Sequence, residues 1–354
     1  MGMHRTRRLN KKERISSSLS RLLIGVLFVL SGWGGLSQNV RAVGVSTSPT
    51  PVTAVSGTAA GIPRASESRT DENTHIRNLV QEEMDISRRM RGPGGWAWRT
   101  SLPDHRLVVF YGNPLSPVMG PLGQFSDDEL IAKLHEQAKA YADLDPSHPI
   151  IPALDYVTPV VQPVPMDDNS WVYRMPAASV EHYIDLANRN QALFFFDMQV
   201  GHSSVKKEVD LVWSYLRRPG VMLALDPEFD MPPGAIPDQV FGRMTADEIN
   251  GAIDRLSELA QSEHLPPKIL IIHQFLKQML PDWQNIKVKP GVQVVTCVDG
   301  FGPPNEKLDD YRMFDKEQLI QYPGMKLFYK LDTPLMPPAA VLAMDPSPLM
   351  VMYQ

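Results

Sequence analysis

Residues 221–228 read Val-Met-Leu-Ala-Leu-Asp-Pro-Glu, a run of five apolar residues followed closely by Asp226 and Glu228. A short apolar run without alternation, closed by a turn-favouring Asp-Pro pair, is typical of a strand buried on both faces. Seven further apolar runs are spaced along the chain, and most also end in a carboxylate or a histidine: residues 107–113, 150–155, 192–197, 269–273, 292–299, 325–332 and 349–353. Strands of this kind predict a parallel sheet.

Helix-like stretches separate most of these runs. Two of the stretches open as capping boxes, at Ser126–Glu129 and Thr245–Glu248, in which each end residue satisfies a free backbone N–H of the other. Eight buried strands that alternate with helices predict an α/β fold, a closed (β/α)8 barrel of the TIM type, from about Leu107 to the C-terminus.

The N-terminal segment has a different composition. Seven basic residues precede or border a short apolar core at Leu22–Leu30, and Val40-Arg41-Ala42 is an acceptable cleavage site, as in a secretory signal peptide. We therefore expect a signal peptide at residues 1–42, a flexible linker at 43–70, and a barrel domain at 71–354 that begins with a helix at 71–90. An uncleaved membrane anchor is the alternative, although the apolar core is short for a membrane span.

Charge and cysteine content narrow the class of protein. Without residues 1–42 the chain keeps 27 basic and 39 acidic residues, so its net charge is −12 instead of the −5 of the whole chain. An acidic chain gains nothing from a polyanionic backbone, so we expect no nucleic-acid partner. The single Cys297 excludes an internal disulfide. We predict an extracytoplasmic bacterial protein, a monomer, which contacts a membrane only if the signal anchor is uncleaved.

In a TIM-type barrel the carboxyl ends of the strands meet at one mouth, where active sites lie. Six acidic residues fall at or near the ends of the predicted strands: Asp155, Asp197, Asp226, Glu228, Asp299 and Asp332. Residues two apart share one face of a strand, so Lys330 is expected beside Asp332. Crowded carboxyl groups cannot all stay ionised, so the pKa of some of them must rise.

The Asp226-Pro227-Glu228 motif resembles the Asp-x-Glu of barrel glycoside hydrolases of the chitinase-like and secreted muramidase-like kinds. The resemblance implies that Glu228 is the general acid and that Asp226 orients it or holds the substrate. It covers this motif and the barrel pattern alone, because Met222 and Ala224 replace the two earlier acidic positions of the chitinase motif.

The expected reaction is hydrolysis of a cell-wall or extracellular polysaccharide or oligosaccharide. Asp226, Asp197 or Asp299 would stabilise the oxocarbenium-like transition state, or act as nucleophile or base. Six residues are candidates for substrate binding: Asp155, His202, His273, Tyr329, Asp332 and Trp171. Trp171 lies in a polar loop and would offer a sugar ring a flat apolar surface.

Three other interpretations stay open. Asp226-Pro227-Glu228 is also compatible with a simple turn. The acidic residues, with His202 and His273, would suit a metal-dependent barrel hydrolase or isomerase, although no His-x-His or His-Glu-x-x-His spacing is present, and we expect no metal or cofactor. The chain is also compatible with a non-catalytic domain that binds envelope glycans. Loss of activity in chelator and its return with Mg²⁺ or Zn²⁺ would favour the metal-dependent enzyme.

Overall fold

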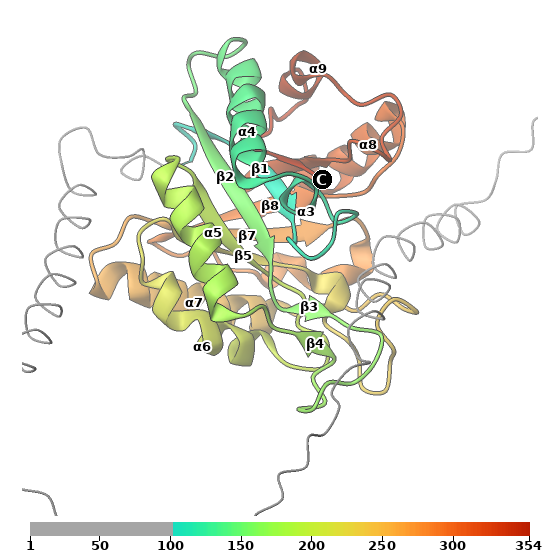
Figure 1. The fold of residues 1–354 in the computed structure, drawn as a ribbon. Coiled ribbons are helices and arrows are strands. Elements are labelled where there is room, and N and C mark those ends of the chain that lie inside the picture. Colours follow the sequence, from blue (N-terminus) through green and yellow to red (C-terminus); the bar gives the residue numbers. More distant parts are fainter. Residues whose placement is uncertain (1–101) are drawn as a thin grey trace, which may run out of the picture. The chain divides into compact units, whose positions relative to one another are not determined.

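The computed structural model describes residues 102–354 (Figure 1). The expected signal peptide, linker and leading helix lie outside the described residues. Within them, no helix combines the length and the apolar character needed to cross a membrane.

Eight parallel strands close into a barrel in the order β1-β10-β9-β8-β7-β6-β5-β2, which confirms the predicted fold class. The first and last strands close it, with Leu107 of β1 opposite Met350 of β10. The barrel strands are β1 (Arg106–Gly112), β2 (Ile150–Val157), β5 (Leu193–Met198), β6 (Val221–Leu225), β7 (Lys268–Gln274), β8 (Val292–Val298), β9 (Tyr322–Leu327) and β10 (Met350–Tyr353). A two-stranded antiparallel sheet, β3 (Val160–Val161) with β4 (Val172–Tyr173), lies in the loop after β2.

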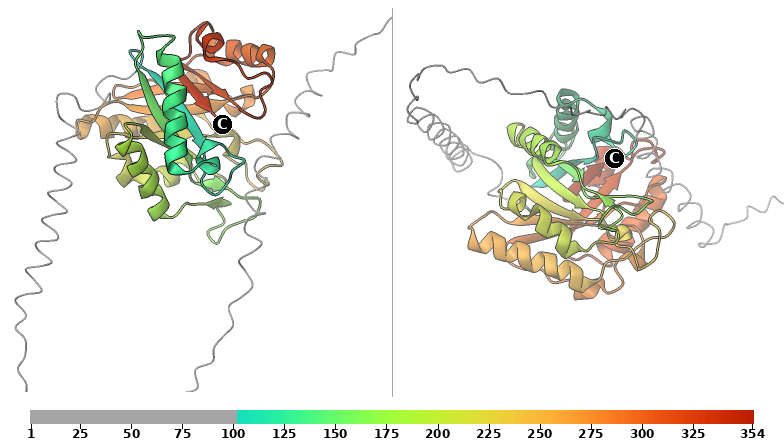
Figure 2. Two further views of the ribbon diagram at one scale, coloured as in Figure 1. Left: turned by 45° about the horizontal axis from the view of Figure 1, so that its top comes forward. Right: turned by 60° about the horizontal axis from the view of Figure 1, so that its bottom comes forward.

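Helices cover the outside of the barrel unevenly (Figure 2). The longer ones are α4 (Asp127–Ala142), α5 (Ala177–Arg189), α6 (Val205–Leu216) and α7 (Ala246–Ser262). The later crossovers are short: the 3-10 turns η3 (Lys277–Met279) and η4 (Trp283–Asn285) follow β7, α8 (Pro304–Tyr311) runs into the π-helical turn η5 (Arg312–Lys316), and α9 (Pro338–Leu342) precedes β10. Two further short elements are α3 (Pro121–Gln124) and the 3-10 turn η2 (Pro227–Phe229).

The two predicted helix starts differ in their caps. Thr245 and Glu248 form both bonds of the capping box that begins α7. Ser126 is the N-cap residue of α4, but its side chain makes no capping bond. Asp127, Asp128 and Glu129 fill the first turn of α4 instead, where negative charge interacts favourably with the helix dipole.

Alternate residues of each strand face two different cores. Leu154, Phe194, Leu223 and Leu270 belong to the apolar layer between the strands and the surrounding helices. The residues between them, such as Asp155, face the barrel interior, because successive side chains point to opposite faces of a strand. Both sets are buried, which explains the continuous apolar runs in the sequence.

The position of β9 differs from the prediction. The seventh strand of the barrel ends at Leu327 and not at Asp332, so the expectation that Lys330 and Asp332 share its inner face is wrong. Pro323 and Gly324 resemble a turn in the sequence, yet both belong to β9. The backbone N–H of Gly324 donates to the buried Asp315 carboxylate at 2.9 Å. The inward-facing position nearest the end of β9 is therefore Lys326.

Candidate active site

A cluster of ionisable side chains lies at the carboxyl ends of the barrel strands, and we call it the mouth cluster. It brings together four of the acidic residues at predicted strand ends with the histidine of β7 and with Glu228 of η2. Each of its members is at most 5% exposed: Tyr111, Asp155, Asp197, Asp226, Glu228, His273, Asp299 and Lys326. Desolvated charges interact strongly, so the protonation of each group depends on the others.

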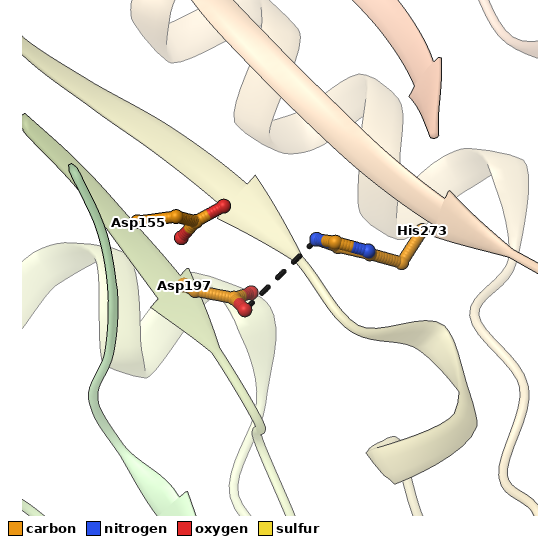
Figure 3. Close-up of side chains that lie close together, drawn as sticks. All are labelled: Asp155, Asp197 and His273. Carbon is orange, nitrogen blue, oxygen red and sulfur yellow. Dashed lines mark ion pairs between the residues drawn. The ribbon is translucent and has the colours of Figure 1, made fainter. Parts of the chain in front are cut away.

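His273 lies between the two sides of the mouth cluster. Its Nδ1 is 3.2 Å from Oδ2 of Asp299. Its Nε2 is directed at Asp197 (Figure 3), 3.9 Å from Oδ2 of that residue. Nε2 is also 3.9 Å from Oδ1 of Asp226. No hydrogen-bond partner of Nε2 exists among residues 102–354. His273 therefore has one nitrogen fixed by a carboxylate and the other directed at acidic groups.

Lys326 and Tyr111 are site residues that the sequence analysis missed. Nζ of Lys326 lies 3.5 Å from Oδ2 of Asp299 and 3.5 Å from the centroid of the Tyr111 ring. Burial by itself would lower the pKa of Lys326, but Asp299, Asp226 and other surrounding groups outweigh burial and raise it. The alternation of side chains along a strand could have identified both residues. Tyr111 lies on the same face of β1 as Val109. Lys326 precedes Lys330 by an even number of residues, so it falls on the strand face that was predicted for Lys330.

Glu228 and Asp299 are driven toward opposite protonation states. Burial, together with the charges of Asp226 and Asp299, raises the pKa of Glu228 well above its usual value. Burial also acts to raise the pKa of Asp299, but Lys326 and His273 outweigh it and lower that pKa. The pKa of Asp226 is raised to about 7 by burial and by Asp197, while His273 and Lys326 act to lower it. The pKa values of two carboxyl groups in one cluster are thus shifted in opposite directions.

Asp155 and Asp197 are the most deeply buried carboxyl groups of the cluster, with no measurable exposure. Burial raises the pKa of both carboxyl groups well above the usual value. None of their four carboxylate oxygens has a well-formed hydrogen bond within the described residues, although Tyr111 is close enough to Asp197 to oppose that rise.

Four predicted substrate-binding residues lie outside the mouth cluster, and two of them, Asp332 and Tyr329, follow β9. Asp332 accepts hydrogen bonds from the backbone N–H groups of Gly302 and Phe328, both at 2.9 Å, and pairs with Lys307 at 3.1 Å. Tyr329 is 40% exposed and stacks on Tyr353. Its ring lines a separate cavity of about 520 Å³ against α4. The expectation that Asp332 joins the other strand-end acidic residues is wrong, because Lys307 and two backbone N–H groups hold it in the loop after β9.

Trp171 and His202 lie together in a second cavity of about 580 Å³. Their ring centroids are 5.5 Å apart, and Met231 and Pro233 also line the cavity. Hydrogen bonds connect it to the segment that carries Glu228. Gly201 N–H donates to the carbonyl of Phe229 at 2.8 Å, and Met231 N–H donates to the carbonyl of Gly201 at 2.9 Å. The aromatic cavity is therefore adjacent to the Glu228 turn.

No protein-family model and no curated protein sequence matches the chain. Two solved structures from Bacillus subtilis show some similarity. One is the spore coat polysaccharide biosynthesis protein spsE, with a TM-score of 0.39 and 13% identity over 70% of this chain and 59% of that chain. The other is a mannanase, with a TM-score of 0.38 and 9% identity over 72% of this chain and 81% of that chain. This chain thus spans less than two thirds of the first protein. A similar fold does not establish a similar activity.

Proposed function

We propose that the protein is an exported glycoside hydrolase that acts on a cell-wall or extracellular polysaccharide with Glu228 as general acid. The observation that carries the proposal is that Glu228 and Asp299 are buried in one barrel mouth, where their surroundings shift their pKa values in opposite directions. Cleavage of a glycosidic bond requires such a pair, a carboxylic acid that protonates the leaving oxygen and a carboxylate that faces the developing positive charge.

The roles follow from the charges around each group. Glu228 donates its proton to the glycosidic oxygen. Asp299 is kept ionised by Lys326 and His273, and it stabilises the oxocarbenium-like carbon or acts as nucleophile or base. Burial, and then the charge of Asp226 two residues earlier, raise the pKa of Glu228 and so favour its acid form.

The cavity of Trp171 and His202 supports a carbohydrate substrate. Its volume of about 580 Å³ lies within the usual range for ligand sites, about 300–1,000 Å³. The Trp171 ring gives it an apolar surface, and the backbone bonds at Gly201 fix it beside the turn that bears Glu228. We propose that one part of the glycan binds in this cavity while the scissile bond reaches Glu228.

The test compares Glu228→Gln with a matched variant in the same region. Glutamine keeps the size of the side chain but cannot act as an acid, so kcat on a responsive cell-wall polysaccharide should fall by about 10²- to 10⁴-fold. Asp238→Asn is the control, because Asp238 follows the same strand, burial raises its pKa to about 6, and asparagine tolerates its φ of 69°. Its kcat should match the unmodified protein.

The assay measures new reducing ends released from a panel of bacterial cell-wall and extracellular polysaccharides. Release by the unmodified protein together with loss in Glu228→Gln supports the proposal. Two results contradict it: no release from any polysaccharide of the panel, or full activity of Glu228→Gln combined with loss of turnover in chelator, which would assign metal-assisted hydrolysis.

A further inference from the structure

The carboxyl groups of Asp155 and Asp197 differ from the others in the mouth cluster, because the lysine of the cluster contacts other residues. Lys326 lies 3.5 Å from Asp299 and against the Tyr111 ring. Asp226 accepts a hydrogen bond from Nε2 of Gln199 at 3.3 Å. Asp155 and Asp197 are the two most deeply buried carboxyl groups of the mouth cluster, and among residues 102–354 their oxygens have no well-formed hydrogen bond. A buried carboxylate is strongly disfavoured unless it is paired, protonated or bound to a metal ion.

The geometry around these two residues includes a third donor. Nε2 of His273 is directed at them, and ligand atoms of Asp155, Asp197 and His273 all lie within 4.8 Å of one another (Figure 3). The 3.9 Å between Nε2 and Oδ2 of Asp197 is too long for a hydrogen bond. Two ligands that are each about 2.0–2.2 Å from one cation lie at most about 4.4 Å apart, so this separation leaves room for an ion between them.

We propose that Asp155, Asp197 and His273 bind one divalent cation at the base of the barrel mouth. The three ligands come from β2, β5 and β7, and the barrel closure places them around one point. Two carboxylates and an imidazole favour an ion of the Zn²⁺ or Mn²⁺ class over Ca²⁺, which prefers six to eight oxygen ligands. This site departs from the sequence-based expectation of a protein without a metal.

Asp299 provides the outer support that such a site needs. Its Oδ2 is 3.2 Å from Nδ1 of His273, so Nδ1–H donates to Asp299 and Nε2 is the ring nitrogen left to bind a cation, which it does in its deprotonated form. Lys326 acts against the cation, since its positive charge faces Asp155 and Asp197. The mouth cluster contains five carboxyl groups and one lysine, so its acidic groups can balance the two positive charges of a divalent cation as well as that of Lys326.

The first experiment measures binding directly and requires no substrate. The chelator-treated, dialysed chain is titrated with Zn²⁺, Mn²⁺ or Ca²⁺ in a calorimeter. We expect one Zn²⁺ or Mn²⁺ per chain, and affinity weaker by about 100-fold or more in Asp155→Asn and Asp197→Asn. Asp315→Asn is the control, because Asp315 is equally buried with one unpartnered oxygen but lies in η5, and it should bind like the unmodified chain.

Thermal unfolding shows whether each variant is folded. Without the ion, Asp197→Asn should have a Tm equal to or higher than that of the unmodified chain, because an amide replaces an unpaired buried carboxylate. With saturating ion, the Tm of the unmodified chain and of Asp315→Asn should rise, while that of Asp197→Asn should not.

Three results would overturn the cation site: no saturable binding, equal affinity in the folded Asp197→Asn variant, or a preference for Ca²⁺. This outcome is independent of the proposed hydrolase. Loss of activity in Glu228→Gln tests the acid, whereas calorimetry on the unmodified chain tests the cation.

Discussion

Replacement of Lys326 by methionine would remove the charge that balances the mouth cluster. Nζ of Lys326 lies 3.5 Å from Oδ2 of Asp299, and the side chains of the two residues are 4% and 6% exposed. Breaking a buried ion pair by removing one partner costs about 3–5 kcal/mol. We therefore expect the free energy of unfolding at pH 7.5 to fall by about that amount in Lys326→Met.

The loss should depend on pH with a definite sign. In the unmodified protein the pKa of Asp299 is lowered in the folded state, so its stabilising contribution is present above the unfolded pKa and disappears as the pH falls through the folded pKa. Lys326→Met removes this contribution and leaves burial to raise the pKa of Asp299. The difference in stability between the two proteins should therefore be largest near pH 7.5 and should decrease toward pH 4.

Urea unfolding followed by tryptophan fluorescence at pH 4.5, 6 and 7.5 in metal-free buffer measures both effects. Lys330→Met is the matched control, because Lys330 is exposed and its replacement should change stability by less than about 0.5 kcal/mol. A loss below about 1 kcal/mol in Lys326→Met, or a loss that is the same at all three pH values, would refute the assignment of Lys326 as the counter-charge of Asp299.

Two further predictions concern the segment between β6 and α7. Burial and Glu248 raise the pKa of Asp230 to about 7, so the folded state binds a proton more tightly than the unfolded state. The free energy of unfolding therefore falls as the pH rises from about 4 to about 7. Asp230→Asn should remove this fall, and parallel curves of Tm against pH for the two proteins would contradict the prediction. Thr245→Ala should lower the free energy of unfolding by about 1 kcal/mol, because Thr245 accepts a bond from Glu248 N–H in the capping box, whereas Ser126→Ala should cost less in the same urea titrations.

The acidic residues of the site were largely predictable. Asp155, Asp197 and Asp299 directly end or follow apolar runs, and parallel strands in a closed barrel bring their carboxyl ends together whatever the loops between them do. Trp171 and His202 were predicted as substrate-binding residues, and the structure places both in one cavity. The functions of these residues remain proposals.

The errors arose where a strand boundary depends on distant residues. Lys330 and Asp332 continue an apolar run that resembles the end of a strand, whereas β9 begins at Tyr322 with Pro323 and Gly324. Leu349 N–H donates to the carbonyl of Pro323, and Gly324 donates to Asp315. These partners are 9 or more residues away, so local propensity could not identify them.

The order of apolar runs and helices in the chain was enough to specify a closed parallel barrel with acidic groups at one mouth, because strand alternation and helix caps act over a few residues. Register and burial in the folded chain placed Lys326 beside Asp299, left Nε2 of His273 facing Asp197, and separated the pKa values of Glu228 and Asp299. Electrostatic energies depend on distances between groups that are far apart in the chain and on the exclusion of water, and neither exists until the barrel has closed.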